Sequence, residues 1–100
     1  MQHTFSVLFS LQTHKINKKN GEAPIWARVT VDGKRAEIST GKKTSPDKWN
    51  VNSGRIRGNT EEARTINSYL NKMIVKLEKI FDQLNEDNQY ISSATIKNIF

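Results

Sequence analysis

Two runs of alternating polar and apolar residues meet at an Asp-Gly pair in this 100-residue chain. Residues 24–31 have the sequence PIWARVTV and residues 34–40 have the sequence KRAEIST, with Asp32 and Gly33 between them. A period of two is typical of a half-buried strand. An Asp-Gly pair between two such runs is the strongest short-range signal of a two-residue hairpin. The runs therefore predict an antiparallel hairpin with one apolar face and one polar face.

A third strand and a long helix complete the predicted fold. Apolar residues alternate again near the start of the chain, at Phe5, Val7, Phe9 and Leu11. The apolar face of a sheet needs a covering layer, and the sequence after residue 59 supplies the three-to-four spacing of an amphipathic helix. Its apolar residues are Ile66, Leu70, Met73, Leu77, Ile80 and Leu84. We expect an α+β fold, with a three-stranded antiparallel sheet at residues 4–40 packed on one C-terminal helix at 60–86, which Asn59 and Glu62 open as a capping box.

The predicted helix is longer than the predicted strands. Its 27 residues would span about 40 Å, whereas an eight-residue strand spans about 27 Å. The far end of the helix therefore needs a further partner, either the C-terminal segment or a molecule outside this chain. The apolar residues at this end are Ile80, Phe81 and Leu84.

Two shorter segments complete the expected domain organisation. Residues 45–49 predict one capped turn, with Ser45 as the cap, Pro46 at the first helical position and Trp49 as a buried plug at the sheet edge. The final SSATIKNIF begins a new helix pattern. We expect residues 1–87 to form one domain, and residues 88–100 to form a linker and the truncated beginning of a helical domain.

The sequence offers little material for catalysis. It contains no cysteine, which excludes disulfides, thiolate nucleophiles and cysteine-based zinc sites. His3 and His14 have no carboxylate or second histidine at metal-ligand spacing, so we interpret both as solvated. A phosphate-binding glycine loop is missing, and no apolar run approaches the roughly 18 residues of a membrane span. We expect a soluble, cytoplasmic protein without a cofactor, and this chain should not itself be an enzyme.

Positive charge is concentrated in the first part of the chain. The net charge is +6, but residues 1–58 carry +7 and residues 59–100 carry −1. This asymmetry predicts that the sheet region, and not the helix, faces a polyanion.

The polar face of the predicted sheet carries the candidate DNA contacts. Arg28 and Arg35 are suited to base edges, because arginine donates two hydrogen bonds to guanine, and Trp26, Thr30 and Ser39 would lie beside them. Lysines at the rim would hold phosphates and fix the register. These lysines are Lys34, Lys42 and Lys43. A small sheet of this kind fits the major groove of double-stranded DNA.

The same residues also fit an ordinary solvated sheet face on which Trp26 covers Leu8, and the pattern alone leaves both interpretations open. A single-strand binder needs several aromatic residues on the sheet. The predicted face supplies only Trp26, so this interpretation ranks low.

Three segments carry a resemblance to a known family: GEAPIWARVTVDGKRAEISTG at 21–41, PDKWN at 46–50 and NTEEARTIN at 59–67. They resemble the N-terminal arm-binding domain of tyrosine recombinases, the phage-type integrases of bacterial mobile elements. The resemblance implies a sheet on a helix that docks into double-stranded arm-type sites during site-specific recombination and DNA integration. It also implies other recombinase subunits as partners.

The catalytic residues of that family are an Arg, a His-x-x-Arg motif and a Tyr nucleophile, and none can be assigned here. His14, for example, is followed by Lys15-Ile16-Asn17. The alternative function is a protein–protein interaction module that regulates recombinase assembly. Such a module would show no sequence preference for duplex DNA.

Overall fold

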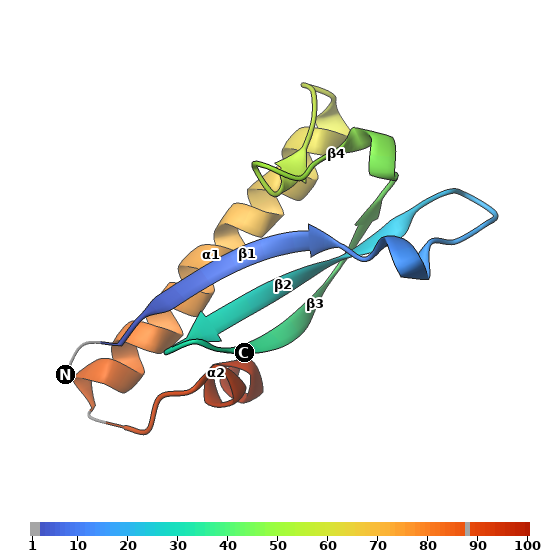
Figure 1. Ribbon diagram of the computed structural model, residues 1–100. Helices are drawn as coiled ribbons and strands as arrows, with labels where there is room; N and C mark the ends of the chain where they lie inside the picture. The colour runs from blue at the N-terminus through green and yellow to red at the C-terminus, as the bar shows by residue number, and fades with distance from the viewer. Residues whose placement is uncertain (1–2, 88) are drawn as a thin grey trace.

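The computed structural model describes residues 3–87 and 89–100 and shows an α+β architecture in which a sheet lies across a long helix (Figure 1). The sheet has three antiparallel strands in the order β1-β2-β3. This confirms the predicted fold class, including the short helix at the C-terminal end. The elements are β1 (Phe5–Leu11), β2 (Ala23–Val31), β3 (Lys34–Thr44), β4 (Trp49–Asn50), β5 (Arg55–Ile56), α1 (Glu61–Glu86) and α2 (Ser93–Ile99), with 3-10 turns at Thr13–Lys15 and Pro46–Lys48.

The central hairpin forms at the predicted Asp-Gly pair. Asp32 has φ of 52° and Gly33 has φ of 82°, and two left-handed residues are what a two-residue hairpin turn requires. The turn fixes the register, with Val31 opposite Lys34 and Ala27 opposite Ile38. Because every second residue points to the same side, this register places the aliphatic residues of the hairpin on one face and leaves Trp26 on the other.

That apolar face and the helices enclose the core. In β2 the odd-numbered residues are buried and the even-numbered ones are half-buried. The most deeply buried side chains come from the sheet and from both helices, and they include Ile25, Val29, Leu70, Leu77 and Ile96. Because Ile96 lies on α2, this helix shares the core of the sheet and α1. The expected domain boundary between residues 87 and 88 stays a prediction.

The far end of α1 finds partners within the chain. Phe81 stacks on Phe5 at the start of β1, with ring centroids 4.6 Å apart. Ile80 and Leu84 are also partly buried against the core, and together with Ile99 and Phe100 they line a groove between the two helices. The C-terminal segment is thus one of the partners that the long helix needs.

The predicted capping box and the predicted end of the third strand are wrong, whereas the bounds of α1 agree with the prediction within one residue. The N-cap of α1 is Thr60, whose side chain accepts a hydrogen bond from the Ala63 N–H at 3.1 Å. A capping box needs Glu or Gln three residues after the cap, and that position holds Ala63, so Asn59 and Glu62 do not form one. Strand β3 also extends beyond residue 40, because a bulge at Gly41 lets the chain resume pairing with Ala23 and Pro24.

The segment between sheet and helix is more ordered than its composition indicates. Strands β4 and β5 form a two-stranded hairpin that lies over the N-terminal end of α1 (Figure 1). The amide of Asn67 on α1 accepts from Ile56 N–H at 2.9 Å and donates to Ile56 C=O at 3.0 Å. A helix side chain thus takes the place of a third strand. Trp49 is 4% exposed, which confirms its prediction as a buried plug.

The interpretation of His3 as solvated and far from a carboxylate is wrong. Its Nδ1 donates to Asp32 Oδ2 at 2.7 Å, and Thr4 N–H donates to the other carboxylate oxygen at 3.0 Å. The antiparallel pairing of β1 with β2 brings the start of the chain to the hairpin turn, which a spacing of 29 residues conceals. The hydrogen bond from His3, followed by that from Thr4, lowers the pKa of the exposed Asp32 carboxyl.

Candidate nucleic-acid interface

The outer face of the sheet lies on the side away from α1 (Figure 1). The strand register places side chains from all three strands on it. Cross-strand pairing places Trp26 opposite Ser39, Arg28 opposite Glu37, and Thr30 opposite Arg35. On the other side of β2, the neighbours of these residues are Ser10, Leu8 and Ser6. The structure therefore brings together five of the predicted contacts on one surface, which we call the outer face. The five residues are Trp26, Arg28, Thr30, Arg35 and Ser39.

Arg28 lies near the centre of the outer face and is partly engaged. Its Nη2 lies 3.4 Å from Glu37 Oε1, and the two side chains are 38% and 43% exposed. Its Nε is buried and has no hydrogen-bond partner. The guanidinium is thus held against the sheet by one long contact, with much of its donor capacity still available to a ligand.

Trp26 is half-buried beneath a lysine from the first loop. Lys15 Nζ lies 4.7 Å from the centre of the Trp26 ring, a cation–π distance. Lys15 comes from the 3-10 turn Thr13–Lys15, so this basic loop borders the outer face beside Trp26. Leu8 remains 64% exposed, which argues against the solvated-face interpretation in which Trp26 covers it.

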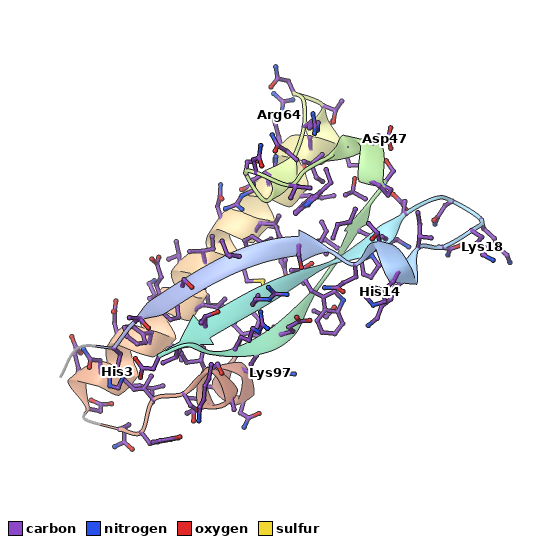
Figure 2. The ribbon with its side chains drawn as sticks, in the orientation of Figure 1. His3, His14, Lys18, Asp47, Arg64 and Lys97 are labelled. Atoms are coloured by element: carbon purple, nitrogen blue, oxygen red, sulfur yellow. The ribbon has the colours of Figure 1, made fainter. Side chains whose placement is uncertain are left out.

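The first loop extends the basic surface beyond the sheet. Its turn is shaped by asparagine side chains, with Asn17 Oδ1 accepting from Lys19 N–H and Asn20 Oδ1 accepting from Glu22 N–H. Figure 2 shows Lys18 at the tip of this loop, far from the helix. These bonds give the loop a defined shape that displays its lysines to solvent.

The lysines at the other end of β3 point to opposite sides. Lys43 pairs with Pro24 and is exposed. Lys42 instead lies on the α1 side, with its Nζ 4.7 Å from the centre of the Tyr69 ring. The structure therefore keeps Lys43 at the edge of the outer face and brings neither Lys42 nor Lys34 there. Lys34 pairs with the buried Val31 and lines a pocket beside the connection between α1 and α2. The alternation that places Ala36, Ile38 and Thr40 inward already assigns Lys34 and Lys42 to the same side, and this signal was missed.

Other chemistry has little support in the part of the chain that the structure describes. Within residues 3–87 and 89–100, no cluster of three or more His, Cys, Asp or Glu side chains could hold a metal ion. Among the same residues, neither helix combines the length and apolarity that crossing a membrane demands.

A small sheet backed by a helix, with arginines on its outer face, is an architecture that β-sheet DNA-binding domains use in the grooves of DNA. A sequence model described as the arm DNA-binding domain matches residues 9–97, and the chain belongs to this family. The family resemblance found in the sequence is thereby confirmed, and the chain is a DNA-binding domain. No curated protein and no solved structure matches the chain.

Proposed function

We propose that this chain is the arm-site-binding part of a tyrosine recombinase, the phage-type integrase of a mobile element. In this role it binds double-stranded arm-type sites sequence-specifically in the cytoplasm, during site-specific recombination and DNA integration, and it needs no cofactor. Catalysis would reside in other parts of the parent recombinase. The observation that carries the proposal is the outer face, where arginines from two paired strands lie beside lysines of the first loop and of the end of β3.

The proposed docking follows from the width of the sheet. A B-DNA major groove is about 12 Å wide and accepts a small β-element. Arg28 and Arg35 would donate to base edges, and Trp26, Thr30 and Ser39 would fill the groove around them. The exposed Leu8 offers an apolar contact to a thymine methyl group. A single module of this size buries about 600 to 1,000 Å² on DNA.

Phosphate binding is assigned to the lysines at the edges of this surface. Lys43 is exposed near the end of β3, and Lys15 lies over Trp26. Lys34, the other predicted phosphate contact on β3, lies on the side of the buried Val31 instead. Lys42, a phosphate contact in the sequence prediction, stands against Tyr69 on the helix side, so we now favour Lys43 for this role. The two adjacent lysines make a matched pair of variants.

Selection from a library of randomised duplexes, followed by titration of the selected duplex at several salt concentrations, tests the proposal. Arg35→Ala should cost about 1 to 3 kcal/mol on the selected duplex and relax its specificity. Lys43→Ala should weaken all duplexes alike and lower the salt slope by about one, while Lys42→Ala should change the slope less. Binding without sequence preference by the parent protein would contradict the proposal.

The second candidate function, assembly with other recombinase subunits, is favoured by the groove between α1 and α2. This groove of about 360 Å³ is lined mainly by apolar side chains and is bordered by Lys76 and Lys79. The opposite side of α1 carries exposed acidic residues, so the groove of one subunit is complementary in charge to the helix of another. These residues are Glu78, Asp82 and Glu86.

Sedimentation equilibrium tests this second candidate. Ile99 is 53% exposed beside the groove, so Ile99→Glu should weaken self-association without unfolding the chain. DNA binding by the same variant should be unchanged, because Ile99 lies on α2, away from the outer face. A parent protein that stays monomeric at high concentration would exclude self-assembly through this groove.

A further inference from the structure

A carboxylate lies on a surface that is otherwise suited to a polyanion. Glu37 is on the edge strand β3, directly opposite Arg28 of the central strand, and 43% of its side chain is exposed. We propose that Glu37 is a specificity-determining residue that reads one G·C base pair together with Arg28. This inference rests on the proposed function, since it requires the outer face to enter the major groove.

Stability gives little reason for the pair. Arg28 and Glu37 are both more than a third exposed and meet in one contact of 3.4 Å, and exposed ion pairs of this kind contribute little to folding. The geometry instead limits where Arg28 can point. Its Nε is buried and its Nη2 faces Glu37, so the guanidinium is oriented before a ligand arrives. Such pre-orientation reduces the entropy lost when the side chain binds.

The chemistry of the two side chains restricts the base pair that they can meet. A carboxylate only accepts hydrogen bonds and a guanidinium only donates them. In the major groove, guanine presents two neighbouring acceptors, N7 and O6, and its partner cytosine presents a donor at N4. An arginine beside a glutamate therefore matches the edge of a G·C pair. An A·T pair lacks the two adjacent acceptors that a bidentate arginine needs.

Glu37 should also penalise wrong sequences. A carboxylate inside a groove flanked by phosphates is repelled unless a donor faces it, and only cytosine N4 and adenine N6 supply major-groove donors. Opposite the acceptors of guanine or thymine, Glu37 would lose its water and gain no donor from the DNA, and Arg28 would be its single hydrogen-bond partner. Specificity then comes from the cost at other base pairs as much as from the contact with the right one.

The first test compares duplexes selected by the parent, by Glu37→Gln and by Glu61→Gln. Glu61 is exposed on α1, so its variant makes the same change in net charge away from the sheet. We expect the parent to select a site with one required G·C pair. The preference of Glu37→Gln for that pair should be weaker than the parent's by at least about fivefold and its other preferences should be kept, whereas Glu61→Gln should select like the parent.

A second test leaves the protein unchanged. Placing N4-methylcytosine in the required pair puts a methyl group where the amino hydrogen faces the major groove. The parent should lose affinity by at least about fivefold, and Glu37→Gln should lose clearly less. Circular dichroism of the variant confirms that the replacement, which conserves shape, has left the fold intact.

The outcomes separate the two proposals. If the parent selects a defined site but Glu37→Gln keeps the same preference at every position, Glu37 reads no base and the inference is wrong, while the proposed function stands. If the parent selects no site at all, the proposed function fails and the inference fails with it.

Discussion

Asp32 shows how one turn residue joins the start of the chain to the central hairpin. Its carboxylate accepts from His3 and from Thr4 N–H, and its own N–H donates to Thr4. These bonds stabilise the ionised carboxylate and lower the pKa of Asp32 in the folded protein. A group of this kind adds stability above its unfolded pKa of about 4, and that stability is lost as the pH falls through the lower, folded pKa.

We therefore expect Asp32→Asn to reduce the acid sensitivity of the fold. Asparagine tolerates the left-handed φ of 52°, so the turn is retained. At neutral pH the variant should unfold at a lower temperature than the parent, and the difference should shrink as the pH drops below about 4. Thermal unfolding followed by circular dichroism across this range measures it, and a difference that does not vary with pH would contradict the assignment.

At the scale of elements, the β4–β5 hairpin depends on a close approach to the sheet. Gly54 has φ of 65°, and a Cβ at this position would lie 3.3 Å from the carbonyl oxygen of Phe9. Arg55, the next residue, stacks over the Phe9 ring at 5.0 Å and donates to Asn71 on α1 at 2.8 and 3.1 Å. The hairpin thus ties β1 to the N-terminal half of the helix.

Gly54→Ala should lower the free energy of unfolding. A left-handed alanine costs about 1 kcal/mol, and the loss should exceed this cost because the methyl group also crowds Phe9. Gly41→Ala is the matched control. Gly41 has a similar φ of 76°, but a Cβ there meets nothing within 4 Å. Urea unfolding of both variants gives the comparison, and equal destabilisation would show that the contact with Phe9 is unimportant.

The elements also show what could be predicted from the sequence. Alternation and the Asp-Gly turn predict the sheet, and the three-to-four spacing predicts α1, because both patterns are repeated many times. The β4–β5 hairpin has two residues per strand, and its outer hydrogen bonds come from the side chain of Asn67, so local pattern carries almost no signal for it. The pairing of His3 with Asp32 is likewise set by tertiary structure, which brings together two residues that lie 29 positions apart in sequence.

For the candidate site, the period of two was sufficient to place five predicted contacts on the outer face. It did not reveal that Arg28 is held by Glu37, or that Lys15 covers Trp26, because both depend on side-chain geometry and on how the first loop folds back. Lys42 was predictable from alternation, but its charge suggested the opposite side.

At the scale of the whole molecule, the packing of α2 bears on where the folded domain ends. Ile96 is completely buried and packs into the core formed by the sheet and α1. The boundary expected between residues 87 and 88 would leave this helix outside the domain. The burial of Ile96 favours a unit that includes it.

Ile96→Ala should therefore destabilise the chain by about 2 to 5 kcal/mol, the usual cost of removing a large buried aliphatic side chain. Denaturant unfolding monitored by the fluorescence of Trp26 on the sheet and of the buried Trp49 reports on the sheet and the N-terminal end of α1. Ala94→Gly, at an exposed position of the same helix, controls for helix weakening alone. An unchanged midpoint for Ile96→Ala would mean that α2 folds independently of the sheet.

The strict division of β2 into buried odd-numbered and accessible even-numbered residues has a practical consequence. Side chains that hold the domain together and side chains that meet solvent occupy separate positions on the same strand. The solvent positions can therefore be randomised together while the scaffold stays constant. A library at Leu8, Trp26, Arg28, Arg35 and Glu37 would make this domain a starting point for engineering modules with new target sequences.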